Sequence, residues 1–292
     1  MAGAILLGFA TVSFTGFRFG LVTWHFSHLL QYQIDKLEQA PAVDILLVGD
    51  SALGNAIDAA AWSQALQRPV LSAALTGTYG YGGSYNMIRR ALRRHAVKTV
   101  VVFNTMKLMA RTDPGQGALF TAETWSDLAT VRPAAVSALL NLATPINIAA
   151  SFFRARESRF AAYAASDYVP QSKALSELLP KPPERPPVDA AGISSDHWPF
   201  LSAIGALCGE KGLRCLYVHG PVGEWECGSS DTFVAAVNEV ASAAGLTPVA
   251  GSPVCMTWAD TGDAEDHVHP GAKAGYSARY LSLVAPYLSG VR

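Results

Sequence analysis

A serine that directly follows an apolar run is the first residue of this sequence whose type and position suggest chemistry. Residues 43–48 read VDILLV, and Gly49, Asp50 and Ser51 follow them. A serine at the carboxyl end of a buried strand lies at the edge of an open α/β sheet, where ligands bind. Its hydroxyl can attack an acyl carbon, and N–H groups at the start of a helix suit the resulting oxyanion. The same position is also typical of a serine that only caps a helix.

A second group of titratable residues lies near the end of the chain, in the segment DAEDHVHPG at 263–271. Asp266 and His269 are three residues apart, so one short loop can present both side chains. The carboxylate can orient the imidazole, which can then act as a general base toward a serine. His267 and Glu265 are alternative partners in the same loop. The clustered Asp and His side chains also permit a metal site, but no ligand set elsewhere completes it, so we predict no metal and no cofactor.

Together, GDSALGN at 49–55 and DHVHP at 266–270 resemble the SGNH (GDSL) hydrolase superfamily. In that superfamily the nucleophile lies in a G-D-S motif after the first strand, and the Asp and His come from a D-x-x-H motif before the last helix. The resemblance implies a three-layer α/β/α flavodoxin-like fold and a catalytic triad of Ser51, Asp266 and His269. The α/β-hydrolases share the order Ser, Asp, His, but the second glycine of their G-x-S-x-G motif comes one position earlier than here.

The resemblance also implies an oxyanion hole made by the N–H groups of Ser51 and Gly77 and the side-chain amide of Asn104. Gly80 is a close rival of Gly77, because both lie in the glycine-rich segment after the second predicted strand. Asn104 follows the third predicted strand, where the superfamily usually reads G-x-N-D. That motif is incomplete here, so Asn104 either supplies the donor or only ends the strand.

Alternating strands and helices must position these residues. The apolar runs predict strands at 43–48, 69–75, 98–103 and 213–218 and near Pro248. The intervening patterns predict helices at 57–66, 84–94, 197–211, 231–244 and 271–288. This alternation is typical of a doubly wound parallel sheet, so we expect an α/β catalytic domain over residues 41–292.

The alternation stops between about 106 and 195. Amphipathic stretches at 121–142 and 146–163 and a proline-rich tract at 180–189 occupy this region. We interpret it as a helical insertion that caps or flanks the active site, or that lies on a membrane. Ordinary surface helices are the alternative.

The N-terminus predicts a membrane anchor. Residues 4–24 are almost all apolar and have the length of a bilayer core, with Arg18 as their one charge. We therefore interpret residues 1–40 as an anchor and stalk, with the catalytic domain on the extracytoplasmic side. A cleaved signal peptide and a buried helix are the alternatives. A signal peptide usually has basic residues at its start, and this sequence has none there.

Composition excludes one class of partner. Lys and Arg number 22 against 23 for Asp and Glu, so no basic excess is present to bind a nucleic acid. Half of the residues are hydrophobic and 15% are charged. The four cysteines, Cys208, Cys215, Cys227 and Cys255, form no C-x-x-C pair, and we favour four small buried side chains over one or two disulfides.

These features predict a serine esterase or O-acyltransferase, and resemblance to one branch of the superfamily implies that it acts on acyl esters, with acetyl esters of a cell-surface or secreted polysaccharide as the expected substrates. The anchor, the insertion and the incomplete third motif resemble membrane-tethered SGNH-like proteins, such as the alginate O-acetylation proteins and the D-alanyl transfer protein of teichoic acids. That resemblance implies a membrane acyl-donor protein as a partner. The alternative is a catalytically weak SGNH-fold protein that binds carbohydrate or serves as a scaffold.

Overall fold

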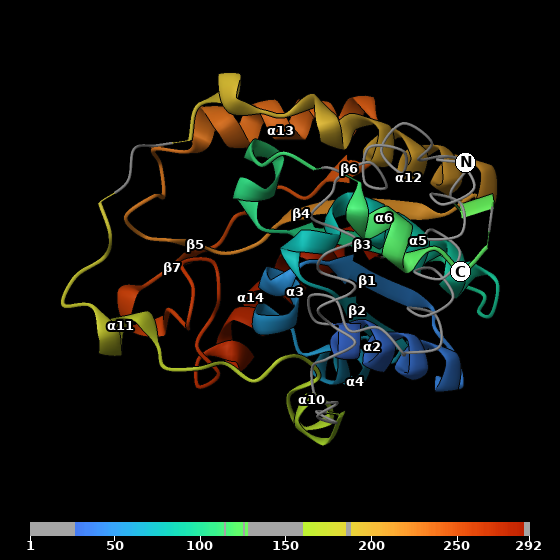
Figure 1. Ribbon diagram of the computed structural model, residues 1–292, viewed down its shortest axis with the longest axis horizontal. Helices are drawn as coiled ribbons and strands as arrows, with labels where there is room; N and C mark the ends of the chain where they lie inside the picture. Colours follow the sequence, from blue (N-terminus) through green and yellow to red (C-terminus); the bar gives the residue numbers. More distant parts are fainter. Residues whose placement is uncertain (1–26, 114, 125, 128–159, 185–187, 289–292) are drawn as a thin grey trace, which may run out of the picture.

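Five parallel strands form the central sheet of the computed structural model, which describes residues 27–288 except 114, 125, 128–159 and 185–187 (Figure 1). The strand order is β2-β1-β3-β4-β6. Because β2 lies on one side of β1 and β3 on the other, the strand order reverses between β1 and β3. The strands are β1 (Ile45–Gly49), β2 (Val70–Ala74), β3 (Thr99–Asn104), β4 (Arg214–His219) and β6 (Thr247–Pro248). A separate pair of short strands consists of β5 (Val222–Gly223) and β7 (Cys255–Met256).

Helices cover both faces of the sheet. In Figure 1, α13 lies near β6 at one edge of the sheet, and α2 and α4 lie near β2 at the other edge. Alternate side chains of β1 enter different core clusters: Leu46 and Val48 enter one, and Ile45 and Leu47 enter the other. The first cluster includes side chains of α5 (Gly80–Leu92), α12 (Trp198–Lys211) and α13 (Asp231–Ala243). The second includes side chains of α3 (Ser51–Ala56), α4 (Ala59–Leu66) and α14 (Lys273–Leu288).

The predicted α/β class and parallel sheet are confirmed. Each predicted strand coincides with an observed one to within two residues at its ends, because strands buried on both faces read as continuous apolar runs. The predicted helix at 57–66 is instead two helices. Asp50 caps α3 through a hydrogen bond from the Ala52 N–H, and Asp58 caps α4 in the same way through Ala61.

Residues 27–39 differ from the expected stalk. They form helix α2 (Ser27–Gln39), whose leucines at 29, 30 and 37 are buried against the core. Leu30, Gln33 and Leu37 recur at helical spacing and give the helix one buried stripe. The predicted anchor at 4–24 lies outside the described residues. Among the helices that are described, none combines the length and the apolar character that crossing a membrane requires.

The prediction of four unpaired cysteines is wrong. Cys208 and Cys215 form a disulfide between α12 and β4, and Cys227 and Cys255 form a second one between the loop after β5 and strand β7. Both pairs join segments that the topology brings together. Sequence spacing alone does not reveal this, because the second pair is separated by 28 residues.

Part of the predicted insertion is described. It contains α6 (Gln116–Thr121), α10 (Phe160–Ser166) and α11 (Leu175–Leu178), whereas most of the amphipathic stretches at 121–142 and 146–163 lie outside the described residues. Figure 1 shows the chain running from α10 to α11 and then back to α12 around one end of the molecule. Tyr163 and Tyr168 anchor this segment in the second core cluster.

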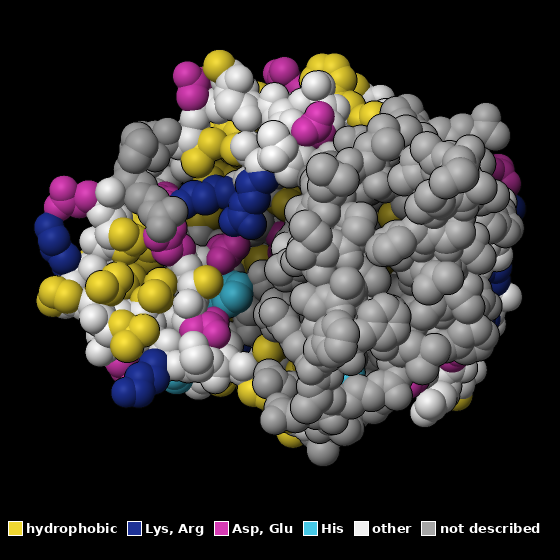
Figure 2. Space-filling view, viewed as in Figure 1, with side chains coloured by type: hydrophobic (Ala, Val, Ile, Leu, Met, Phe, Trp, Pro, Cys, Tyr) yellow, Lys and Arg dark blue, Asp and Glu magenta, His cyan; other side chains and the backbone are white. Residues whose placement is uncertain are grey.

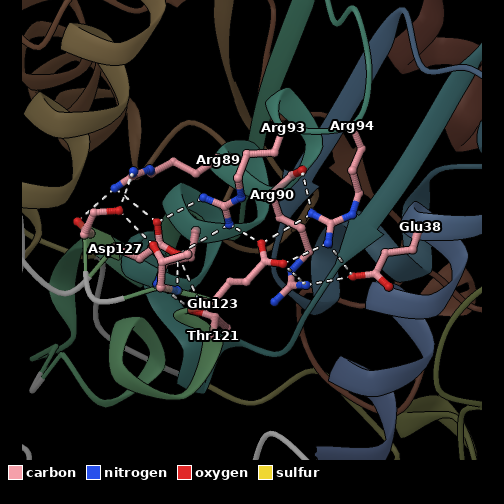
Figure 3. Close-up of polar contacts among 11 residues, drawn as sticks. Glu38, Arg89, Arg90, Arg93, Arg94, Thr121, Glu123 and Asp127 are labelled. Atoms are coloured by element: carbon pink, nitrogen blue, oxygen red, sulfur yellow. Dashed lines mark hydrogen bonds and ion pairs between the residues drawn. The ribbon is translucent and has the colours of Figure 1, made fainter.

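Two arginines of α5 and two that directly follow it join this helix to α2 and to the segment after α6 (Figure 3). The Glu123 carboxylate pairs with three of them, and Glu38 and Asp127 each pair with two. The arginines are Arg89, Arg90, Arg93 and Arg94. The Asp127 side chain is fully buried, and the network holds the beginning of the insertion against α5.

Candidate active site

Asp50 ties the ends of two neighbouring strands together. The preceding residue must be glycine, because a Cβ on Gly49 would lie 1.7 Å from the carbonyl oxygen of Phe103 in β3. Beyond this close approach, the Asp50 carboxylate accepts the Thr105 N–H at 3.0 and 3.1 Å and the Ala52 N–H at 3.0 Å. Burial, with a smaller contribution from the charge of Asp266, raises the pKa of Asp50 to about 7.

Ser51 follows as the first residue of α3 and is half-buried. Its carbonyl oxygen accepts a hydrogen bond from Asn55 Nδ2 at 2.9 Å. Its hydroxyl has no hydrogen-bond partner among the residues that the structure describes. The side chain is therefore fixed in position by its helix and retains a hydroxyl that can bond to a substrate.

The two other predicted oxyanion donors lie after the neighbouring strands of the same sheet edge. Gly77 follows β2, and no acceptor in the described part of the chain takes its N–H. Asn104 ends β3 and is 1% exposed, yet neither atom of its amide has a partner among the described residues. A buried amide without partners is unusual in a folded protein and indicates a group that can serve a ligand. The rival Gly80 has a φ of 55° and packs against Asp113.

The histidine loop pairs its residues differently from the predicted triad. His267 Nδ1 lies 2.7 Å from Asp263 Oδ1, and its Nε2 lies 3.8 Å from Asp266 Oδ1. His269 Nδ1 instead accepts the Gly271 N–H at 3.2 Å. Within the described residues, no hydrogen bond joins Asp266 to His269 or either imidazole to Ser51. The structure thus associates Asp266 with His267.

Carboxylates control the protonation of His267. Burial alone lowers the pKa of this imidazole, but the hydrogen bond to Asp263 and the charges of Asp266 and Asp50 outweigh burial and raise it. The Val268 side chain is fully buried in the core. Because successive side chains of an extended segment point to opposite sides, His267 and His269 both face away from that core.

One side chain connects the serine helix with the histidine loop. Gln171 Nε2 donates to Asn55 Oδ1 at 2.8 Å and to the Val268 carbonyl oxygen at 2.6 Å. Asn55 belongs to α3, and Val268 lies between the two histidines. Gln171 comes from the predicted insertion and carries no sequence pattern, so reasoning from the sequence missed it.

A pocket of about 300 Å³ lies beside this edge of the sheet. Its lining includes Thr105, Lys107, Arg111 and Asp266, but not Ser51 or His269. Figure 2 shows basic and acidic side chains gathered beside a histidine on the described part of one face.

In the described part of the chain, no three His, Cys, Asp or Glu side chains form a group that could hold a metal ion. Comparisons of the chain with protein-family models, curated proteins and solved structures find no match.

Proposed function

We propose that this protein is a serine esterase or O-acyltransferase of the SGNH type. The observation that carries the proposal is the Gln171 amide, which hydrogen-bonds both to the helix that begins with Ser51 and to the loop that contains the two histidines. Segments more than 200 residues apart in the sequence thereby meet at the carboxyl end of a parallel sheet, where open α/β folds bind ligands. The strand order supports the flavodoxin-like arrangement that the SGNH resemblance implies.

The proposed reaction begins when a histidine removes the Ser51 proton and Oγ attacks the acyl carbon. The N–H groups of Ser51 and Gly77 and the Asn104 amide stabilise the oxyanion of the tetrahedral intermediate. The intermediate then collapses, and the histidine returns its proton to the departing alcohol, leaving an acyl group on Ser51. Water or a sugar hydroxyl attacks this acyl-enzyme in the same way and restores the serine.

Two histidines compete for the role of base. The SGNH resemblance assigns it to His269 with Asp266, and we retain that assignment as the proposal. The hydrogen bond between Asp263 and His267 favours a second arrangement, in which His267 is the base and Asp263 orients it. The two arrangements make opposite predictions for His267→Asn and His269→Asn.

Labelling with a fluorophosphonate probe tests the proposal directly. We expect the folded full-length protein to be labelled at Ser51 and to release p-nitrophenol from p-nitrophenyl acetate. Ser51→Ala should abolish both signals, whereas Ser242→Ala, which alters an exposed helix serine, should leave both unchanged. The histidine whose replacement by Asn lowers turnover by several orders of magnitude is the base. Absence of labelling in the folded wild-type protein contradicts the proposal.

A binding or scaffold protein is the second candidate function. The absence of a hydrogen bond between Asp266 and His269 in the described structure favours it, because a base without an orienting carboxylate is inefficient. Such a protein would bind acylated oligosaccharides and release no alcohol. Isothermal calorimetry with acetylated and deacetylated oligosaccharides, run beside the turnover assay, separates the two functions.

We also propose an extracytoplasmic location with attachment to the membrane. The two disulfides support an oxidising compartment, where such bonds persist. The apolar sequence at 4–24 supports the attachment. Alkaline carbonate extraction of membranes tests it: the protein should remain in the pellet, and release into the supernatant contradicts an anchor. The acyl donor would then be a membrane protein, and the acceptor a carbohydrate.

A further inference from the structure

Arg111 is a cation of the 300 Å³ pocket and has no partner among the residues that the structure describes. The pocket lining contains two cations, Lys107 and Arg111. The Lys107 ammonium lies 2.5 Å from a carboxylate oxygen of Glu226 and 3.3 Å from one of Glu265. The Arg111 side chain, by contrast, makes no ion pair or hydrogen bond with any residue that the structure describes. Its five N–H donors therefore remain available to a ligand.

The main chain of Arg111 is held firmly although its side chain is exposed. Its N–H donates to the Leu108 carbonyl oxygen at 3.0 Å, and its own carbonyl oxygen lies 2.7 Å from Nε2 of His197. Because a carbonyl oxygen only accepts, Nε2 of His197 carries the proton. The His197 ring is fully buried and packs edge-on against Tyr81, with 5.3 Å between ring centroids. A buried residue thus anchors the backbone from which the guanidinium extends.

The guanidinium points toward the proposed catalytic edge. Its Nη1 lies 3.3 Å from the position that a Cβ on Gly77 would occupy, so it rests against the backbone of a proposed oxyanion donor. Its charge also acts on Asp50, the residue before Ser51: burial dominates and raises the pKa of Asp50, and Arg111 opposes that rise. Asp266 lines the same pocket. Arg111 therefore lies between the residues on which the proposed reaction depends.

Within the described residues, the acidic side chains of the pocket do not pair with Arg111. Glu226 and Glu265 share the Lys107 ammonium. Asp266 has His267 at 3.8 Å, and the nearby carboxylates favour the charged form of that imidazole. Two acids thus share one ammonium and the third lies beside His267, and none of the three forms an ion pair with Arg111 in the described structure.

We propose that Arg111 binds an anionic group, a carboxylate or a phosphate, on the substrate whose ester reacts at Ser51. The planar guanidinium matches either oxyanion through two parallel hydrogen bonds, which a lysine cannot reproduce. This inference rests on the proposed function and narrows the substrate class to esters whose acyl or alcohol part is negatively charged within reach of Arg111.

Binding of three related probes to the full-length protein tests the inference without turnover. The probes are 4-acetamidobenzoate, 4-acetamidophenyl phosphate and methyl 4-acetamidobenzoate, which carry a carboxylate, a phosphate and no charge. We expect Arg111→Gln to raise the Kd of at least one anionic probe by about tenfold or more and to leave the neutral probe unchanged. The anion whose affinity falls further identifies the chemistry, and Arg111→Lys should restore only part of it.

Arg279→Gln is the matched control, because Arg279 is an exposed arginine of α14 that lies over the Tyr276 ring away from the pocket lining. Equal affinity of wild type and Arg111→Gln for both anions overturns the inference, as does an equal loss in Arg279→Gln. Hydrolysis of 4-acetoxybenzoate and its methyl ester separates this outcome from failure of the proposed function. Arg111→Gln should raise KM for the charged ester alone. If neither ester is hydrolysed but the anions bind through Arg111, the proposed function fails and the anion site stands.

Discussion

Asp50 should make the stability of the protein depend on pH. Its pKa is about 7 in the folded protein, above the value of 3.8 for an unperturbed side chain. Between these values the folded state holds a proton that the unfolded state releases. The free energy of unfolding should therefore fall as pH rises from about 4 to about 7, by up to about 1 kcal/mol per pH unit from this residue.

Chemical denaturation at several pH values measures this slope. Asp50→Asn should flatten the slope, because the variant side chain does not titrate. Asp58→Asn is the matched control, since Asp58 also caps a helix but is exposed. An identical slope in Asp50→Asn and the wild type would show that Asp50 does not cause the pH dependence.

Gly49 should tolerate no side chain. A Cβ at this position would lie 1.7 Å from the Phe103 carbonyl oxygen, and neither strand can move without disrupting the sheet. We expect Gly49→Ala to destabilise the protein by about 3 kcal/mol or more. Gly209→Ala in α12 should instead stabilise it by about 1 kcal/mol, because nothing lies within 4 Å of the added methyl group. Thermal unfolding of both variants checks the pair, and similar Tm values would refute the argument.

At the residue scale, the sequence predicts the position of those site residues that stand at the end of a predicted strand. Ser51 and Gly77 come after β1 and β2, and Asn104 is the last residue of β3, so all three lie at the carboxyl edge of the sheet. The pairing of His267 with Asp263 could not be predicted, because both histidines are compatible with the spacing of the loop. Gln171 could not be predicted either, because its two hydrogen bonds exist only after three distant segments have packed together.

At the scale of elements, the arginines in the last turn of α5 and directly after it should make the attachment of the insertion sensitive to acid. Burial opposes ionisation of Glu123, but hydrogen bonds from Arg94 and Arg93 and the charge of Arg90 outweigh it and lower its pKa to about 2. The stability that this carboxylate contributes is fully present above the unperturbed pKa of 4.5 and is lost as pH falls through about 2.

Glu123→Gln should lower the free energy of unfolding by about 1–3 kcal/mol, since three arginines lose a charged acceptor (Figure 3). Glu38→Gln should cost less than about 1 kcal/mol, because its side chain is 37% exposed and solvent screens its pairs. Urea denaturation at neutral pH compares the two. A larger loss for Glu38→Gln would show that the network is not centred on Glu123.

The five strands of the sheet and the helices α5, α12, α13 and α14 were predictable from the sequence, whereas α2, β5 and β7 were not. The leucine stripe of α2 is present in the sequence, but it is short and interrupted by polar residues, so the segment resembles a stalk. Strands β5 and β7 have two residues each and leave no periodic pattern. Their pairing depends on the chain path around the end of the sheet.

At the scale of the whole molecule, the two disulfides should contribute unequally to stability. Cys227–Cys255 closes a loop of 28 residues in sequence separation, and Cys208–Cys215 one of 7. Loop-closure entropy then gives about 3–4 kcal/mol for the first bond and about 2–3 kcal/mol for the second. Denaturation of Cys227→Ser/Cys255→Ser and Cys208→Ser/Cys215→Ser double variants measures both. Peptide mapping without reductant should recover the two cross-linked pairs, and free thiols at these positions would contradict the pairing.

The Gln171 amide has a consequence for how this protein can diversify. The central sheet fixes where Ser51, the proposed nucleophile, lies, but a segment outside the sheet connects the Ser51 helix to the histidine loop. Replacing residues 160–184 by a short loop would spare every strand and still remove the shared hydrogen-bond donor. Relatives that differ in this segment should therefore differ in catalytic competence as well as in substrate range, and exchange of the segment between them should transfer both properties together.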